Sequence, residues 1–382
     1  MTGMSMRGLL WRRAKSDWGI VVVTLALVVL GLVMILSTSR ELPYINLLFE
    51  GGADTYFKAQ LQYATMGLIA MLIISRIDYR LYQRLAVPIG IGTLVLLVLM
   101  AVLQGRFLFV SAEDIGTVGR GQVTEVAKYG VIIYLAAWLS AAGPRLKEFR
   151  TGMVPAATIL AVSCGLIVLQ RDLSTTMLLG VVCIIMLFVA GADTRQLVVL
   201  AIVSILVSAL LAFFVAYRQN RLFIFVTNPL SDPWNKGYQS VRSLVALNNG
   251  RLFGLGLAKG IESRNLHSMA HTDFMFAMIG EQLGFVGGLG TIALYVLWTH
   301  RGLRVALRSA DNFGRLVAIG LVSWEACRAL LHLAVATNTV PITGTVLPFV
   351  SYGGSALVAG LAALGVLVNI SRQAMLEAEA PR

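Results

Sequence analysis

The chain has 382 residues, of which 57% are hydrophobic and only 13% are charged. A water-soluble domain of this size could not cover so much apolar surface, so the composition excludes a soluble protein and predicts a membrane protein with many spans. The formal net charge is +12, with the basic residues spread between apolar runs. This pattern favours anionic lipid head groups over nucleic acid as the partner of the basic residues.

Apolar runs of about 20 residues are long enough to cross a bilayer as helices. Ten runs of this kind predict an all-α polytopic membrane protein, with a large folded loop between helices 7 and 8. They cover residues 18–38, 59–76, 84–104, 124–142, 153–170, 174–191, 195–217, 274–299, 314–337 and 349–370. No soluble domain or short repeat is visible, so residues 1–382 are predicted to form a single transmembrane domain.

The basic N-terminus is similar to the start of a signal peptide, but the following run is too long and lacks a cleavage pattern of small residues. We therefore interpret residues 18–38 as the first span. Lys and Arg residues concentrate on the side of the membrane that carries both termini. Both termini are thus predicted to be cytoplasmic, and the long loop is predicted to lie on the outer face.

The long polar segment between the seventh and eighth spans covers about residues 218–273 and is rich in aromatic residues and glycines. Such a composition predicts a folded segment rather than a simple linker. Apolar residues recur at helical spacing from Tyr238 to Leu247, beside Gln239. They predict a short amphipathic helix that either lies at the lipid interface or packs on the spans.

Charged residues inside or beside spans are costly and mark candidate functional positions. One shared site at the predicted outer face is geometrically possible for Glu125, Lys128, Asp172, Arg218, Arg221 and Asp273. Glu125 and Lys128 are three residues apart, so they form either a structural salt bridge or a pair whose Lys holds an anion. Arg218 and Arg221 either clamp a phosphate or reach toward lipid head groups.

Asp273 stands at the start of the eighth span, where an Asp commonly caps the free N–H groups of a helix. Glu281 falls on the same helix face, so two carboxylates could line one cleft. We nevertheless interpret Glu281 as a buried hydrogen-bonding partner. Glu325 and Arg328, three residues apart in the ninth span, are predicted to form an internal ion pair.

The three cysteines lie inside apolar runs and predict no disulfide, and the histidines show no metal-ligand spacing. Residues 341–355 are rich in Pro, Gly, Ser and Thr and would break a helix at the predicted outer end. Irregular backbone persists at membrane depth only when it is buried in protein or lines a cavity. The segment is therefore predicted to do one or the other.

Several motifs are characteristic when taken together. They are Gly237-Tyr238-Gln239, Leu252-Phe253-Gly254-Leu255-Gly256-Leu257, His271-Thr272-Asp273-Phe274, Gly280-Glu281-Gln282-Leu283-Gly284-Phe285, Pro341-Ile342-Thr343-Gly344 and Ser351-Tyr352-Gly353-Gly354-Ser355. As a set, with the ten spans and the long loop, they resemble the SEDS family, the FtsW, RodA and SpoVE proteins of bacterial wall synthesis. Residues 122–128 and 170–175 add weaker matches. The segment 77–80 favours an FtsW-like member.

The resemblance implies a peptidoglycan glycosyltransferase that polymerises lipid II into glycan strands at the outer face of the bacterial cytoplasmic membrane, in division or elongation. Asp273 matches the essential aspartate of the family and would act as general base. A divalent cation, Mg²⁺ or Mn²⁺, could stabilise the leaving pyrophosphate. The implied partners are a class B penicillin-binding protein transpeptidase, the nascent glycan strand and membrane lipids.

The residues expected to bind substrate beside Asp273 are Glu125, Lys128, Asp172, Arg218, Arg221, Gln239, His271, Thr272 and Ser351. Some positions depart from the family pattern. Ser268 and Met269 stand where Pro-Glu is common, Val123 and Arg171 replace prolines, and His332 stands near a customary Asn.

Two other classes of function stay open. A lipid II flippase would also be polytopic and carry charges inside its spans, but the charges here gather at the predicted outer face, which favours surface chemistry. A scaffold that binds partners of the division or elongation machinery without catalysis is kept open by the altered residues before His271.

Overall fold

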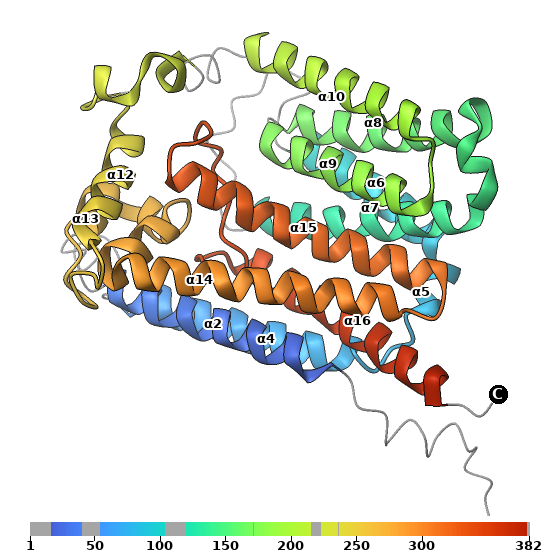
Figure 1. Ribbon diagram of the computed structural model, residues 1–382, viewed down its shortest axis with the longest axis horizontal. Coiled ribbons are helices and arrows are strands. Elements are labelled where there is room, and N and C mark those ends of the chain that lie inside the picture. The colour runs from blue at the N-terminus through green and yellow to red at the C-terminus, as the bar shows by residue number, and fades with distance from the viewer. Residues whose placement is uncertain are drawn as a thin grey trace, which may run out of the picture.

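The computed structural model describes residues 17–39, 54–103, 120–170, 172–214, 223–235 and 237–379, and in these ranges the chain is helical without strands (Figure 1). The long helices are α2 (Trp18–Ser39), α4 (Thr55–Ile74), α6 (Ala86–Leu103), α7 (Arg120–Ala142), α8 (Val154–Leu169), α9 (Leu173–Ala190), α10 (Thr194–Phe214), α14 (Met275–Arg308), α15 (Asn312–Ala336) and α16 (Gly354–Glu379). Within the described residues nine helices are long and apolar enough to cross a membrane, and α6 is a shorter apolar helix. The predicted all-α polytopic fold is confirmed.

Several helix boundaries differ from the prediction, most clearly those of α14 and α16. α14 continues beyond residue 299 to Arg308, and α16 begins at Gly354 rather than at residue 349. Hydropathy follows the apolar part of a helix, so it misses the Arg-rich extension of α14. It also counts Phe349 and Val350 as helix, although both lie in a turn before α16.

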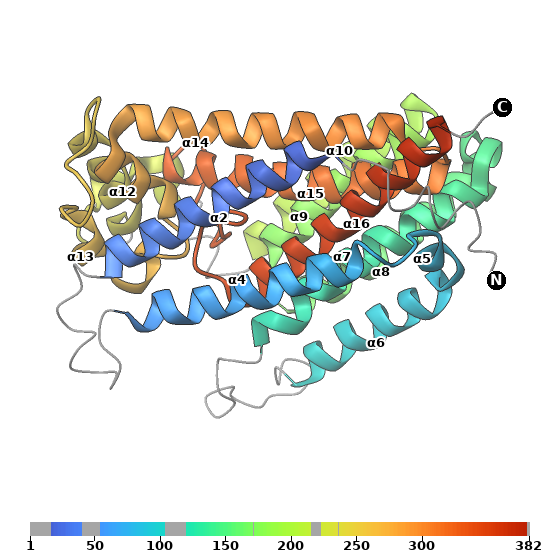
Figure 2. The same ribbon diagram turned by 90° about the horizontal axis from the view of Figure 1, so that it is seen from below.

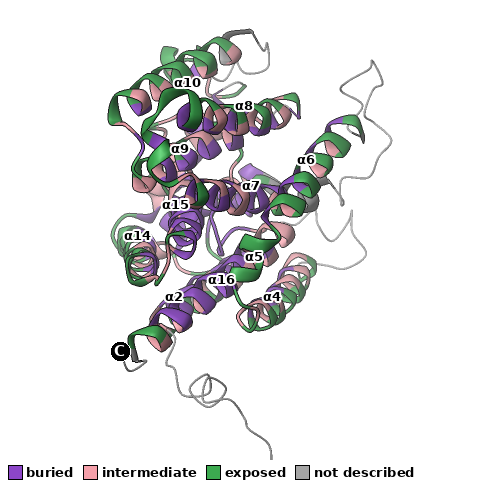
Figure 3. Cartoon of the chain, turned by 90° about the vertical axis from the view of Figure 1, so that its right-hand side faces the viewer, coloured by how far each residue is buried: buried purple, intermediate pink, exposed green. Residues whose placement is uncertain are grey.

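α15 lies in the middle of the bundle, where it packs against α7, α9, α14 and α16. Figure 3 shows α15 and α16 as mostly buried, whereas α6 and α10 carry large exposed surfaces at the periphery. The exposed residues of α10 are predominantly apolar. In a bilayer such a surface costs little, because lipid tails are as apolar as the side chains.

α4 and α16 lie side by side and approach closely through glycines (Figure 2). A Cβ on Gly67 would lie 2.6 Å from Cδ1 of Leu361, and a Cβ on Gly365 would lie 2.7 Å from the carbonyl oxygen of Met71. Small residues at such contacts let helix backbones approach each other in membranes. The two helices therefore form a tightly packed pair.

The first and last described residues lie at the same end of the bundle, which we call the terminal end (Figures 1 and 2). The N–H of Asp17 donates to Oγ of Ser371 at 3.0 Å, and the Asp17 carboxylate lies 3.4 Å from Arg301. Helices α12 (Tyr238–Gly250) and α13 (Glu262–Leu266) lie at the opposite end, the loop end.

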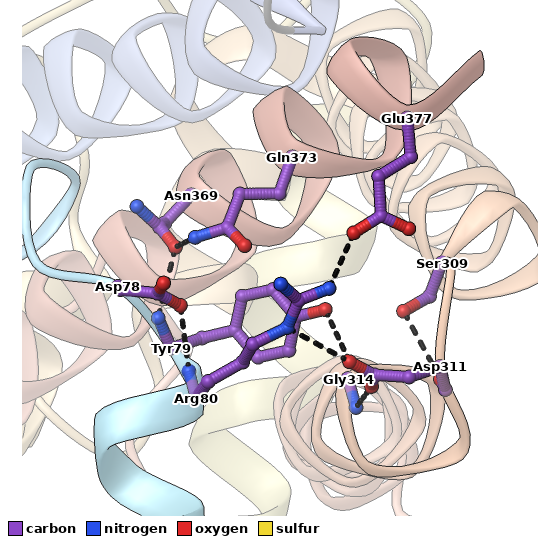
Figure 4. Close-up of polar contacts among 9 residues, drawn as sticks. All are labelled: Asp78, Tyr79, Arg80, Ser309, Asp311, Gly314, Asn369, Gln373 and Glu377. Carbon is purple, nitrogen blue, oxygen red and sulfur yellow. Dashed lines mark hydrogen bonds and ion pairs between the residues drawn. The ribbon is translucent and has the colours of Figure 1, made fainter. Parts of the chain in front are cut away.

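A polar cluster fixes the terminal end (Figure 4). The hydroxyl of Tyr79, just before α5 (Arg80–Arg84), donates to Oδ2 of Asp311 at 2.7 Å. Arg80 reaches the same Asp311 oxygen at 3.4 Å and also pairs with Glu377 of α16. Burial and the Asp311 carboxylate raise the pKa of Tyr79, so its hydroxyl stays a donor. The cluster joins α5, α15 and α16.

The amphipathic helix predicted in the long loop is α12, and it packs against α14 and α15. Its buried face consists of small residues, and Oγ of Ser243 donates to the carbonyl of Ala336 at 2.8 Å. The apolar residues that predicted the helix, such as Leu244, are only half-buried. Of the two alternatives, packing on the spans describes the contacts of α12.

α14 breaks at Gly284, whose φ is 70°. The break releases backbone groups on both sides, and residues 251–256 of the loop pair with them. Leu255 and Gly256 donate to the carbonyls of Glu281 and Gln282 at 2.9 and 3.0 Å, while Phe285 and Val286 donate to the carbonyls of Arg251 and Leu252 at 2.8 and 3.1 Å. The two glycine-rich motifs are therefore partners in one backbone-to-backbone junction.

We expect Gly254→Ala to destabilise this junction. Gly254 has a φ of 81°, and a Cβ there would lie 2.2 Å from the carbonyl oxygen of Gln282. Left-handed backbone alone costs a residue with a Cβ about 1–2 kcal/mol, and displaced backbone adds to this loss in free energy of unfolding. The measurement is the melting temperature in detergent. Gly165→Ala, in α8 with open space around it, serves as the control. Equal melting temperatures for the two variants would contradict the proposed contribution of the junction to stability.

Candidate functional site

Asp273 lies in a turn between η4 (His267–Ala270) and α14. The N–H groups of Thr272, Asp273 and Phe274 all donate to the carbonyl of Met269, at 3.3, 3.0 and 3.1 Å. The N-cap of α14 is Phe274, so Asp273 stands one residue outside the capping position. Its side chain is partly exposed.

The non-helical segment 341–353 lies against this turn. The N–H of Tyr352 donates to the carbonyl of His271 at 2.8 Å, and Oγ of Ser351 donates to the carbonyl of Thr272 at 2.7 Å. A Cβ on Gly344 would lie 3.7 Å from Oδ2 of Asp273. The structure thus brings four predicted site residues together, with the backbone of Gly344 beside the Asp273 carboxylate.

His332 of α15 joins this segment to α14. Its Nδ1 lies 2.7 Å from the carbonyl of Thr345, and its Nε2 lies 3.4 Å from the N–H of Phe276. These contacts assign the proton to Nδ1, because Nδ1 must donate to the carbonyl while Nε2 accepts. The customary Asn of the family can also donate and accept. His332 therefore makes both kinds of hydrogen bond that an Asn side chain could make.

Asp172 is the N-cap of α9. Its Oδ1 accepts the N–H of Thr175 at 3.0 Å. Ser174, two residues after Asp172, donates its hydroxyl to the carbonyl of Thr343 at 3.1 Å. The first turn of α9 therefore borders the segment 341–353, and Asp172 has a defined role as a helix cap.

The predicted pair Glu125 and Lys128 belongs to a buried ion network between α7 and α15. Nζ of Lys128 lies 2.7 Å from Glu125, whose other oxygen lies 3.4 Å from Arg328. Arg328 lies 3.6 Å from Glu325, which also accepts the hydroxyl of Tyr129. Two positive and two negative groups balance, so Lys128 is paired and the salt-bridge alternative is supported. The predicted Glu325–Arg328 pair is confirmed.

One face of α15 links this network to the segment 341–353 and to the start of α14. Glu325, Arg328 and His332 follow one another at spacings of three and four residues, which places them on the same side of the helix. The ring of Trp324 lies 5.8 Å from the cationic groups of both Lys128 and Arg328. Sequence analysis did not assign His332 to the site, although its spacing from Arg328 was a usable signal.

His271 is fully buried. Its ring centroid lies 5.0 Å from that of Tyr56, which meets the ring of Tyr352 edge-on at 5.1 Å. Neither ring nitrogen of His271 has a hydrogen-bond partner among the described residues. Burial lowers the pKa of His271 to about 4, so the side chain is neutral at pH 7. Sequence analysis missed Tyr56, which lies before the predicted span 59–76 but inside α4.

Gln239 and Glu281 organise the loop next to this turn. Nε2 of Gln239 lies 2.9 Å from Sδ of Met269, so it sits beside the turn that leads to Asp273. The carboxylate of Glu281 accepts the N–H groups of Ile261 and Glu262 at 3.0 and 3.1 Å. Glu281 therefore holds the loop, as its interpretation as a hydrogen-bonding partner predicts, and does not form a second cleft carboxylate.

Arg218 and Arg221, the predicted phosphate clamp, lie outside the described residues. Across the described part of the chain, no group of three or more His, Cys, Asp or Glu side chains could hold a metal ion. Cys164, Cys183 and Cys327 are free thiols.

Residues 17–376 match the family described as Cell cycle protein, which comprises FtsW, RodA and SpoVE, and the chain belongs to this family of multi-pass membrane proteins. The chain is 34% identical to the probable peptidoglycan glycosyltransferase FtsW of Geobacter metallireducens, over 94% of this chain and 95% of that protein. It is 35% identical to stage V sporulation protein E of Bacillus subtilis, over 94% and 98%.

Solved structures show the same fold. A chain in a peptidoglycan synthase complex that coordinates polymerization and crosslinking has a TM-score of 0.72 and 26% identity, over 94% of this chain and 98% of that one. The rod shape determining protein RodA of Thermus thermophilus has a TM-score of 0.66 and 26% identity, over 94% and 97%. The family predicted from the sequence is confirmed.

Replacing Arg328 by Leu should destabilise the protein strongly. The change leaves Glu325 buried without its cation and takes one partner from Glu125. Breaking a buried ion pair from one side typically costs about 3–5 kcal/mol in free energy of unfolding. The measurement is the melting temperature in detergent, with Arg304→Leu on an exposed position of α14 as control. Equal, small losses in both variants would contradict a buried network.

The burial of His271 predicts a pH dependence of stability. An unfolded His has a pKa of about 6.5, so the unfolded state takes up the proton first as the pH falls. The stability associated with neutral His271 is complete above pH ~6.5 and is lost as the pH falls toward 4, by about 2 kcal/mol between pH 7 and pH 5. Melting temperatures of the wild type should therefore fall more over this range than those of His271→Leu. Parallel slopes for the wild type and His271→Leu would refute the prediction.

Proposed function

We propose that this chain is a peptidoglycan glycosyltransferase that polymerises lipid II into glycan strands, with Asp273 as general base. The observation that carries the proposal is the setting of Asp273. Its carboxylate is partly exposed on a turn that is fixed from both sides, and the backbone of Gly344 stands beside it. The name of the Geobacter metallireducens relative supplies the reaction class.

In the proposed reaction the Asp273 carboxylate takes the proton of an acceptor sugar hydroxyl as the hydroxyl oxygen attacks the anomeric carbon of the donor. The new C–O bond forms while the bond to the lipid pyrophosphate breaks, and the pyrophosphate leaves with the electron pair. Asp273 then releases its proton to solvent. A single displacement of this kind inverts the anomeric centre.

The neighbouring residues act mainly through the backbone. Ser351 and Tyr352 hold the carbonyls of Thr272 and His271, and His332 holds the carbonyl of Thr345. We assign these residues to fixing Asp273 relative to Gly344. Such preorganisation is what a general base requires, because the geometry of proton transfer decides its efficiency.

The leaving pyrophosphate requires positive charge. Lys128 is paired with Glu125, so we keep Arg218 and Arg221 as the proposed clamp. We propose that Mg²⁺ or Mn²⁺ enters with the pyrophosphate of the donor and is part of the substrate.

We further propose that both termini are cytoplasmic and that the loop end faces outward from the bacterial cytoplasmic membrane. The distribution of Lys and Arg supports this orientation, and both described ends of the chain lie at the terminal end. A class B penicillin-binding protein transpeptidase is the proposed partner. The similar chain in a complex that couples polymerization to crosslinking supports it.

The ion network favours the enzyme over the flippase. A flippase needs polar groups that a head group can reach along a path through the membrane. Lys128, Glu325 and Arg328 are instead buried and paired within the network. These charges have a structural role in holding α7 against α15.

We expect Asp273→Asn to abolish polymerisation without unfolding the protein. Loss of a general base typically lowers the rate by about 10²–10⁴-fold. The assay uses labelled lipid II, the purified protein with its transpeptidase partner, and Mg²⁺ or Mn²⁺, with glycan strands as the readout.

Asp78→Asn, at an exposed position of the terminal end, is the control and should keep the wild-type rate. Full activity of Asp273→Asn would rule out its role as base. A wild type that makes no strands under any of these conditions would rule out the transferase itself.

A further inference from the structure

Gln60 lies early in α4 and is 1% exposed. Its Nε2 donates to the carbonyl of Ser351 at 3.2 Å, and its Oε1 accepts the N–H of Gly353 at 3.3 Å. Both contacts fall on the turn that precedes α16. A single carboxamide therefore holds this turn by one donor and one acceptor.

The same turn holds the proposed base from its other side. Ser351 and Tyr352 donate to the carbonyls of Thr272 and His271, the two residues before Asp273. Two hydrogen bonds thus connect Gln60 to residues 351–353, and two more connect Ser351 and Tyr352 to the residues before Asp273.

The chemistry of the turn explains why a Gln stands here. Backbone that leaves a helix near the membrane exposes N–H and C=O groups that lipid cannot satisfy. Gln supplies a donor and an acceptor from one side chain, whereas a carboxylate supplies only acceptors and an apolar residue supplies neither. A buried polar group left without its partner is costly, so the carboxamide and the turn hold each other in place.

Asn369 makes the matching contact at the terminal end (Figure 4). Its Oδ1 accepts the N–H of Tyr79 at 3.0 Å, and its Nδ2 donates to the carbonyl of Ser75 at 3.0 Å. Gln60 of α4 thus holds the backbone before α16, and Asn369 of α16 holds the backbone after α4. The two clamps have the same chemistry, but only the Gln60 clamp touches the turn beside Asp273.

We propose that Gln60 is a positioning residue for the sugar transfer reaction. It fixes the turn 351–353, and through it the turn 271–273, so that the Asp273 carboxylate keeps its place beside Gly344. This inference rests on the proposed function. Nothing in the family motifs of the sequence points to Gln60, since its partners lie about 290 residues away.

The test compares two variants that each remove one buried carboxamide. Gln60→Met and Asn369→Leu both lose two hydrogen bonds to backbone, so both should lower the melting temperature. Gln60→Met should also lower kcat for glycan polymerisation by about 10–100-fold with a nearly unchanged KM for lipid II, because a small misplacement of a catalytic group is enough for such a loss. Asn369→Leu should keep kcat, and so should Gln62→Met at an exposed position of α4.

Hydrogen exchange of the purified proteins separates this inference from the proposed function. Gln60→Met should speed exchange in peptides covering residues 347–354 and 270–276, and Asn369→Leu should not. Equal losses of kcat in Gln60→Met and Asn369→Leu, or unchanged exchange in Gln60→Met, would overturn the positioning role while strands from the wild type still support the transferase. A wild type without strands would overturn the proposed function and with it the catalytic meaning of Gln60.

Discussion

The structure depends on one constraint: backbone N–H and C=O groups that leave a helix at membrane depth must find partners inside the protein. The loop end breaks helical geometry at two places, at Gly284 in α14 and along residues 341–353. At the first place, residues 251–256 pair with the released backbone groups. At the second, side chains from α4, α9 and α15 do so, through Gln60, Ser174 and His332. The long loop and the helix bundle are therefore one structure rather than a bundle with an appended loop.

The same requirement fixes the candidate base. Asp273 takes its position from backbone carbonyls that are held by Ser351 and Tyr352 and by the shared acceptor at Met269. The terminal end carries the matching clamp of Asn369 and, in addition, ion pairs such as Arg80–Asp311 that are partly exposed. Exposed pairs contribute little to stability, and both side chains are screened by solvent. Hydrogen bonds from buried side chains to backbone hold both ends of the bundle, and at the loop end they hold the turn where the chemistry is proposed to occur.

Much of the fold could be predicted from the sequence, because each span is an apolar run whose length the bilayer sets. The ion pair of Glu325 and Arg328 was also accessible, since helical spacing brings the two together. Contacts between distant segments were not accessible. The pairing of Lys128 with Glu125 was one of two local alternatives, but the contact of Arg328 from another helix with Glu125 was not, and the role of Asp172 depends on where α9 begins. Local pattern does not determine either.

The contacts of Met269 and His332 show how the structure accommodates two departures from the family pattern. Ser268 and Met269 replace a common Pro-Glu, which kept a non-catalytic scaffold open as an interpretation of the sequence. In the structure Met269 serves the turn through its backbone carbonyl, which accepts three N–H groups, including that of Asp273. Every residue type has that carbonyl, so the replacement leaves the backbone hydrogen bonds that position Asp273 intact. It changes mainly the side-chain contact with Gln239. His332 likewise keeps the donor and acceptor that Asn would offer. At Met269 and His332, backbone or shared hydrogen-bonding chemistry carries the contacts, so these two departures leave the hydrogen bonds around Asp273 in place.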